Sequence, residues 1–295
     1  MNSKTIGVIG LGSIGMRHAK NLLELGHTVL VYDPAYSGHL IEGFPLVATF
    51  TDVFSGDGVV IASPTQHHLA HLDLALREMK KPVFVEKPIG DNLKYAKLLL
   101  SEDKAPVMVG NNLRFHPCVK QAKVWMQEIG TPIWASFTCS QLSTKPQYLR
   151  DGVLLNWGAH EIDLALYLLG PAKVAACVGD ETFADVCLLH ESGVRSTVHV
   201  DYNTPVERRG FFIAGFDGNI DSNVVGRNVK LTRTVGSAPI NFYVADTTID
   251  DDYVEEMQAF IDLIDGNPVP HAATGEDGLR TLEIILAAKK MAGIA

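Results

Sequence analysis

Near its start the chain carries a glycine-rich segment between a predicted strand and a predicted helix, and this arrangement constrains the fold most. The segment is Gly10-Leu11-Gly12-Ser13-Ile14-Gly15, which follows the apolar run 5–9 and precedes the helical pattern of 16–25. In such a segment the first glycine permits a tight turn, the second lets the backbone approach a pyrophosphate, and the third lets helix and strand pack closely. The helix N-terminus adds unpaired N–H groups and a partial positive charge. The pattern favours a dinucleotide site over a glycine-rich turn of another α/β protein.

The second predicted strand, 27–32, ends at an acidic residue, Asp33. A carboxylate at this place accepts hydrogen bonds from the ribose hydroxyls of adenosine and repels a 2′-phosphate. Asp33 therefore favours NAD over NADP as the cofactor.

The composition describes a globular chain and excludes several function classes. Its 295 residues suffice for two domains, and 46% hydrophobic with 20% charged residues argue against disorder. Because the formal charge is -9 and Lys and Arg form no cluster, we expect no nucleic-acid partner. We see neither a secretory signal nor a run of about 18 apolar residues, so we expect a cytoplasmic protein without membrane association. The four cysteines lack metal-ligand spacing, which predicts free thiols and no metal site.

Strands and helices alternate through the first part of the chain. We expect strands at 5–9, 27–32, 58–62, 82–86 and 106–110, and helices at 16–25, 67–79 and 92–101. This alternation predicts a doubly wound parallel sheet that helices cover on both faces. The first domain is therefore an α/β Rossmann domain of residues 1–112 that binds NAD.

The pattern changes at residue 113. Helices are expected at 117–129, 159–169, 251–264 and 276–291, and an extended segment at 132–140. Between 173 and 244 the chain has the pattern of successive strands separated by turn residues. These elements predict a second, α+β domain of residues 113–295.

Three further segments carry side chains suited to chemistry. Ser63-Pro64-Thr65, with His68 beyond it, follows one predicted strand, and Glu86-Lys87-Pro88 ends the next. Doubly wound sheets bind ligands at the carboxyl ends of their strands, so we expect both segments to line the cofactor site. The third segment, 152–163, contains Asn156, His160 and Asp163.

On these segments the chain resembles the glucose-fructose oxidoreductase and inositol dehydrogenase family of NAD(P)-dependent sugar oxidoreductases. The resemblance covers nearly the whole length and includes Asn112-Leu113-Arg114-Phe115 and Thr274-Gly275-Glu276-Asp277-Gly278. It implies that the second domain is built on an open, mainly antiparallel sheet and that a sugar-like small molecule binds between the domains. It also implies an enzyme acting on CH–OH groups and a cis peptide bond before Pro88. We further expect a homodimer or homotetramer that forms through the sheet of the second domain.

Lys87 is the first candidate for catalysis. Oxidation of a secondary alcohol requires hydride transfer to the nicotinamide, removal of the hydroxyl proton and stabilisation of the developing oxyanion. A lysine supplies a charge and a proton route if burial and the positive nicotinamide ring lower its pKa from about 10.4. The alternative is an exposed lysine before a rigid proline, but the Glu-Lys-Pro frame favours catalysis.

His160 is the expected partner of Lys87, because an imidazole exchanges a proton near neutral pH; the alternative is a core histidine. Inositol dehydrogenase-like members carry an acidic residue four positions earlier, whereas this chain has Asn156. An amide orients a hydroxyl but takes no proton, so His160 would carry more of the base role. Asn156 is expected to cap a helix, to contact the substrate, or both. Residues 156, 160 and 163 share a helical face if the helix begins early, and Asp163 would then hold the His160 ring or the substrate.

Arg114 begins the second domain. Its guanidinium either binds a carboxylate or phosphate of the substrate or holds the domain interface through a surface ion pair. The segment around it resembles family members associated with surface-polysaccharide sugars, which favours a nucleotide sugar or an anionic sugar. Lys145, Tyr148 and Arg150 lie in a loop expected to cover the substrate, with Tyr148 as a contact.

Two other functions stay open. A chain that retained the fold without the chemistry would be an NAD-binding sensor or regulatory protein, although cofactor binding alone does not require Lys87. The same fold would also serve an oxidoreductase of a cyclitol, an imine or a linear tetrapyrrole.

Overall fold

In the computed structural model the contacts divide the chain into two units. The described residues are 2–36, 40–41, 44–45, 47, 49–101, 105–143, 151–225, 228–235, 238–246, 248 and 250–294. The first unit comprises Met1–Asn112 and Asp252–Leu279, and the second comprises Leu113–Asp251 and Arg280–Ala295. The expectation that 113–295 form one continuous second domain is therefore wrong for Asp252–Leu279, which belong to the first unit.

The first unit is built on a six-stranded sheet with the order β16-β7-β6-β5-β1-β2. Its parallel strands are β1 (Thr5–Ile9), β2 (Thr28–Tyr32), β5 (Gly58–Ile61), β6 (Val83–Glu86) and β7 (Val107–Gly110), and β16 (Ala273–Thr274) pairs antiparallel to β7. Every residue of β5 and β6 is buried, as in a sheet that helices cover on both faces. A two-stranded sheet pairs β3 (Leu40–Ile41) with β4 (Phe44–Pro45). The predicted doubly wound Rossmann sheet is confirmed.

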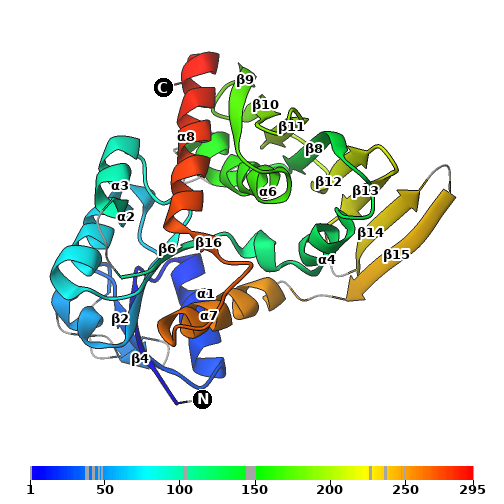
Figure 1. Cartoon of the computed structure of the whole chain (residues 1–295). Coiled ribbons are helices and arrows are strands. Elements are labelled where there is room, and N and C mark those ends of the chain that lie inside the picture. Colours follow the sequence, from blue (N-terminus) through cyan, green and yellow to red (C-terminus); the bar gives the residue numbers. More distant parts are fainter. Residues whose placement is uncertain are drawn as a thin grey trace. The chain divides into compact units, whose positions relative to one another are not determined.

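Helices cover both faces of this sheet. They are α1 (Ser13–Glu24), α2 (Thr65–Asp73), α3 (Leu93–Leu100) and α7 (Asp251–Ile264), with the 3-10 turn η1 (Phe50–Ser55) and the π-helical turn η2 (Leu74–Met79). Helices α1 and α7 lie on one face, and α2 and α3 lie on the other (Figure 1). The Phe84 ring of β6 packs against the rings of His18 and Phe260, with centroid distances of 5.0 Å and 5.8 Å. The apolar side of α7 is thus buried against the Rossmann sheet, which explains why this late segment returns to the first unit.

The second unit is built on an eight-stranded sheet with the order β15-β14-β13-β12-β8-β11-β10-β9. Its strands are β8 (Pro132–Ser140), β9 (Ala172–Gly179), β10 (Phe183–His190), β11 (Arg195–Asp201), β12 (Arg208–Gly215), β13 (Gly218–Asn223), β14 (Asn228–Val235) and β15 (Ala238–Asp246). Strands β8 and β11 pair in parallel, whereas the other neighbours pair antiparallel. The open, mainly antiparallel sheet is confirmed.

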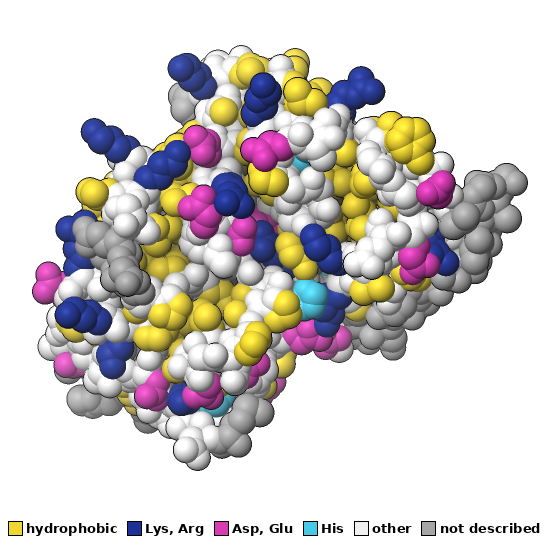
Figure 2. Space-filling view, in the orientation of Figure 1, with side chains coloured by type: hydrophobic (Ala, Val, Ile, Leu, Met, Phe, Trp, Pro, Cys, Tyr) yellow, Lys and Arg dark blue, Asp and Glu magenta, His cyan; other side chains and the backbone are white. Residues whose placement is uncertain are grey.

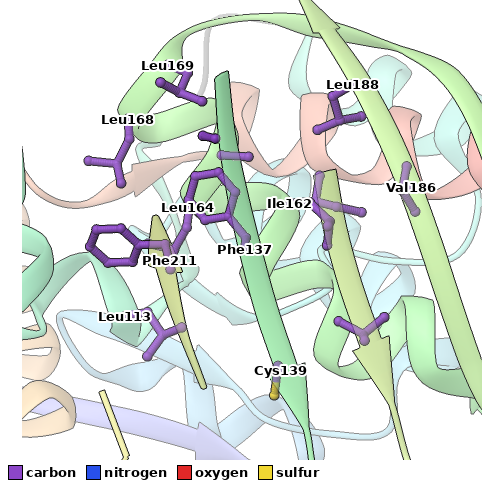
Figure 3. Close-up of a cluster of buried hydrophobic side chains, with 14 of the residues drawn as sticks. Leu113, Phe137, Cys139, Ile162, Leu164, Leu168, Leu169, Val186, Leu188 and Phe211 are labelled. Carbon is purple, nitrogen blue, oxygen red and sulfur yellow. The ribbon is translucent and has the colours of Figure 1, made fainter. Parts of the chain in front are cut away.

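The core of the second unit lies on one face of this sheet. Helices α4 (Pro117–Trp125) and α6 (Ala159–Leu169), with the later part of α8 (Gly275–Ala292), contribute to a cluster that includes Phe137, Ile162 and Ile285. Figure 3 shows Phe137 of β8 and Ile162 of α6 among these side chains. Successive residues of β10 alternate between buried and exposed, so the opposite face of the sheet is open.

Two observations concern the molecular surface. No helix among the described residues is both long and apolar enough to cross a bilayer. On the face shown in Figure 2, Lys and Arg side chains are scattered among acidic and apolar ones and form no continuous stripe.

Candidate functional site

The glycine segment forms the turn from β1 to α1. Gly10 has φ +90°, a conformation that favours glycine. A Cβ on Gly15 would lie 1.9 Å from the Gly10 carbonyl oxygen, so the close approach of helix and strand requires glycine there. Gly12 differs, because nothing lies within 4 Å of where its Cβ would be. Since Gly12 is the N-cap of α1, this open space borders the helix N-terminus and fits a pyrophosphate.

Asp33 follows β2 and is held beside the same turn. Its Oδ2 accepts a hydrogen bond from the Leu11 amide at 2.7 Å, and its Oδ1 accepts one from the Ala35 amide at 2.8 Å. A carboxylate has about four acceptor sites, so these bonds orient the group and leave capacity for ribose hydroxyls. The arrangement fits the expected cofactor.

The segment Ser63-Pro64-Thr65 connects β5 to α2. Ser63 Oγ lies 3.0 Å from His71 Nδ1. His68 is 1% exposed, and its ring nitrogens lie 2.7 Å from the Ser63 carbonyl oxygen and 2.8 Å from that of Pro88. Burial lowers the pKa of His68 in spite of these carbonyl groups. His68 therefore connects the loop after β5 to the loop after β6, and its direct contact with the cofactor stays a prediction.

Glu86-Lys87-Pro88 lies at the carboxyl end of β6. Glu86 is buried, and its Oε2 accepts a hydrogen bond from the Lys87 amide at 3.2 Å. The Lys87–Pro88 peptide bond is cis, as the resemblance implied. Lys87 itself is partly buried. The backbone of this lysine is thus held by Glu86 on one side and by the contact of His68 with Pro88 on the other.

In the second unit, residues 151–169 form one continuous helical stretch. It contains the π-helical turn η4 (Leu154–Gly158) and then α6. Asn156 lies in η4 and His160 lies in the first turn of α6, and both side chains are partly buried. The helical stretch begins before Asn156, which was the condition for residues 156, 160 and 163 to share a face. Asn156 therefore lies in the interior of the stretch and not at its N-terminus. The helix-cap interpretation of Asn156 is therefore wrong, and π-helical turns occur often at functional sites.

Arg114 and Asp163 form a buried ion pair. Arg114 Nε donates to Asp163 Oδ2 at 2.8 Å and Nη2 donates to Oδ1 at 2.7 Å. The two residues are 4% and 1% exposed, and the guanidinium Cζ lies 4.7 Å from the centroid of the Tyr167 ring. These contacts support an ion pair for Arg114, but the pair is buried, so the expectation of a surface ion pair is wrong. Contacts of Arg114, Asp163 or His160 with substrate stay predictions.

Two buried groups of charged residues were not predicted from the sequence. Glu161 is 1% exposed, and its Oε1 accepts a hydrogen bond from Arg209 Nε at 2.8 Å and lies 2.8 Å from Arg209 Nη2 in an ion pair. Burial raises the pKa of Glu161, and the Arg209 charge opposes this shift. The other group joins His18, Glu86 and Glu256. The available signal was a charged residue on the apolar side of a helix, at Glu161 in α6 and at Glu256 in α7.

The loop expected to cover the substrate, with Lys145, Tyr148 and Arg150, lies outside the described residues.

Comparisons with known proteins agree with this geometry. Residues 4–111 match the family model described as an oxidoreductase family with an NAD-binding Rossmann fold, and residues 121–221 match the GFO/IDH/MocA C-terminal domain. Myo-inositol 2-dehydrogenase of Thermotoga maritima is 28% identical, with 97% of this chain and 95% of that protein covered. The scyllo-inositol 2-dehydrogenase (NAD(+)) of Bacillus subtilis is 26% identical, with 95% and 92% covered. A crystal structure of a probable dehydrogenase from Thermotoga maritima superposes with a TM-score of 0.80 at 26% identity, covering 97% of this chain and 96% of that one.

Proposed function

Because the chain belongs to the GFO/IDH/MocA family of NAD(P)-dependent oxidoreductases, we propose that it oxidises a secondary hydroxyl of a sugar or cyclitol, or reduces the corresponding ketone. The chain is a dehydrogenase that acts on CH–OH groups. The observation that carries the proposal is the lysine held at the carboxyl end of β6 by Glu86 and Pro88. Inositol dehydrogenases among its relatives support a polyhydroxylated ring as the substrate class.

Each candidate side chain has a distinct proposed task. Bound NAD supplies the hydride acceptor. Lys87 takes the hydroxyl proton and stabilises the developing oxyanion through its charge. His160 exchanges that proton near neutral pH. The Asn156 amide forms hydrogen bonds but is not a base, so it orients a substrate hydroxyl without taking its proton.

The first test follows NADH absorbance when NAD is mixed with free sugars, sugar phosphates, cyclitols and nucleotide sugars. The Lys87→Ala variant should lose turnover by at least about 100-fold, because a positioned proton-transfer group contributes that much. Its NAD affinity, measured by calorimetry, should stay close to that of the wild type. Lys94→Ala, at an exposed lysine of α3, is the matched control and should be fully active. Unchanged turnover of Lys87→Ala would refute the proposed chemistry, and a silent panel with intact NAD binding would favour the sensor function.

We also propose NAD as the preferred cofactor, on the basis of Asp33. Asp33→Asn keeps one acceptor oxygen and removes the charge. NAD should bind about tenfold more weakly, since hydrogen bonds to charged groups contribute about 1.5–3 kcal/mol, and the discrimination against NADP should fall. Equal discrimination in variant and wild type would contradict this assignment.

The open face of the second unit's sheet supports a homo-oligomer. Trp134, Val178 and Leu189 are 45%, 67% and 37% exposed, and a surface depression is lined by Trp134, Leu189 and Arg195. Exposed apolar side chains gathered on one sheet face are typical of interaction surfaces. Trp134→Glu should reduce the mass measured by light scattering, whereas a monomeric wild type would contradict the proposal.

Free cysteines, including exposed Cys187, suit a reducing cytoplasm, where we propose that the protein acts.

A further inference from the structure

Three titratable side chains form a buried triad next to the carboxyl end of β6. The triad consists of His18 of α1, Glu86 of β6 and Glu256 of α7, which are 0%, 7% and 0% exposed. One nitrogen or oxygen atom of each lies within 4.8 Å of those of the other two. All three belong to the first unit, although Glu256 follows Glu86 by more than half of the chain.

The triad is buried beneath aromatic rings. The rings of Phe84 and Tyr253 meet the His18 ring edge-on, with centroid distances of 5.0 Å and 6.1 Å. A Cβ on Gly110, which pairs with Glu86 across the sheet, would lie 2.9 Å from Glu86 Oε1. The fold therefore keeps room for this carboxylate by placing a glycine opposite it. Two carboxylates this close in a buried site need a shared proton or a cation between them.

The distances favour a proton over a metal ion. Nitrogen and oxygen ligands lie about 2.0–2.2 Å from an ion such as zinc, which at tetrahedral angles separates two ligand atoms by more than about 3 Å. His18 Nε2 lies only 2.6 Å from Glu86 Oε1. That separation is typical of a short, charge-assisted hydrogen bond.

The triad is connected to the proposed catalytic lysine. Glu86 Oε1 lies 2.6 Å from His18 Nε2, and Glu86 Oε2 accepts a hydrogen bond from the Lys87 amide at 3.2 Å. We propose that His18 and Glu256 are positioning residues for Lys87: together they fix the Glu86 carboxylate and place a net negative charge beside the lysine. This inference rests on the role of Lys87 proposed above.

The charge follows from the composition of the triad. With both carboxylates ionised and the shared proton carried by the His18 ring, the net charge of the triad is -1. This negative charge stabilises the ammonium form of Lys87. Burial, and then the charge of Glu86, raises the pKa of Tyr253. Among the described residues, the charged or titratable groups near the triad include Tyr253, Asp252, Arg17, Lys87 and His68.

The experiment compares Glu256→Gln with Glu255→Gln, an exposed neighbour on the same helix. Glu256→Gln removes one negative charge at nearly constant volume. The acidic limb of the kcat profile for alcohol oxidation should move to lower pH by about 0.5–1 unit, because the lysine ammonium loses a stabilising charge. KM for NAD should stay unchanged, and Glu255→Gln should reproduce the wild-type profile. His18→Gln, which keeps an N–H donor toward Glu86, should retain more activity than His18→Leu.

Nitrogen NMR of the His18 ring tests the triad without relying on activity. In the wild-type protein, Nε2 should carry a proton and show the shift of a strong hydrogen bond, and the signal should change in Glu256→Gln but not in Glu255→Gln. An Nε2 without a proton would overturn the inference, even if Glu256→Gln proves unable to fold. Stoichiometric metal in the purified wild type, lost in Glu256→Gln, would overturn it as well.

The outcomes separate the inference from the proposed function. A folded Glu256→Gln with a wild-type pH profile overturns the positioning role, while an inactive Lys87→Ala leaves the proposed chemistry standing. An active Lys87→Ala refutes that chemistry, and the positioning role is then refuted with it.

Discussion

Replacement of Asp163 by Asn should destabilise the second unit. The Asp163 carboxylate accepts two hydrogen bonds from Arg114, at 2.8 Å and 2.7 Å, and both residues are almost fully buried. Removing one partner of a buried ion pair costs about 3–5 kcal/mol, because the remaining charge loses its compensation. Asparagine keeps one acceptor oxygen, so we expect a loss near the lower limit, about 3 kcal/mol.

Tryptophan fluorescence gives a selective assay for this loss. The three tryptophans, Trp125, Trp134 and Trp157, all lie in the second unit, which also contains the ion pair. Guanidinium unfolding of Asp163→Asn should show an earlier transition with the same slope, while Asp221→Asn, at an exposed position on β13, should change stability by less than about 0.5 kcal/mol. A loss below about 1 kcal/mol, combined with a raised KM for anionic substrates only, would refute the reasoning and make Arg114 a substrate contact.

Three further outcomes follow from single residues. Gly15→Ala should destabilise the first unit, because its Cβ would lie 1.9 Å from a backbone oxygen. Gly12→Ala, which has open space for its Cβ, should weaken NAD binding without lowering the melting temperature. Equal melting temperatures of the two variants would contradict this. Burial lowers the pKa of His71 and of His116 to about 4, so both stay neutral in the folded protein while the unfolded chain binds protons below pH of about 6.5. The free energy of unfolding should therefore decrease as the pH falls from about 6.5 to about 4, and a flat profile in urea titrations across this window would count against it. Gly110→Ala places a Cβ 2.9 Å from Glu86 Oε1 and should lower kcat more than it raises KM for NAD, as steady-state kinetics can show.

Local periodicity predicted most elements well. The predicted helices 159–169 and 251–264 match α6 and α7 residue for residue, because both carry a regular apolar stripe. The same periodicity could not show which sheet a helix packs against. The return of α7 to the first unit depends on the contact of Phe260 with Phe84, which lies far earlier in the chain.

The candidate site was predicted where its chemistry is local. The turn at Gly10 and the Glu86-Lys87-Pro88 segment are contiguous, and the cis bond before Pro88 was expected. The Arg114–Asp163 pair joins residues 49 positions apart, and the triad joins three separate elements. A sequence pattern gives the identity of such side chains but not their partners, because only tertiary packing selects them.

The discontinuous first unit has a consequence for biosynthesis. On the ribosome, residues 1–112 emerge before α7 and β16 have been synthesised. Phe84 and the Glu86 carboxylate therefore lack their α7 neighbours, Phe260 and Glu256, until late in the synthesis of the 295-residue chain. The nucleotide-binding half is therefore complete only after residue 279 has been made, by which time all strands of the other half have been synthesised. Gene fusions that exchange this half as a cassette need three junctions, after residues 112, 251 and 279.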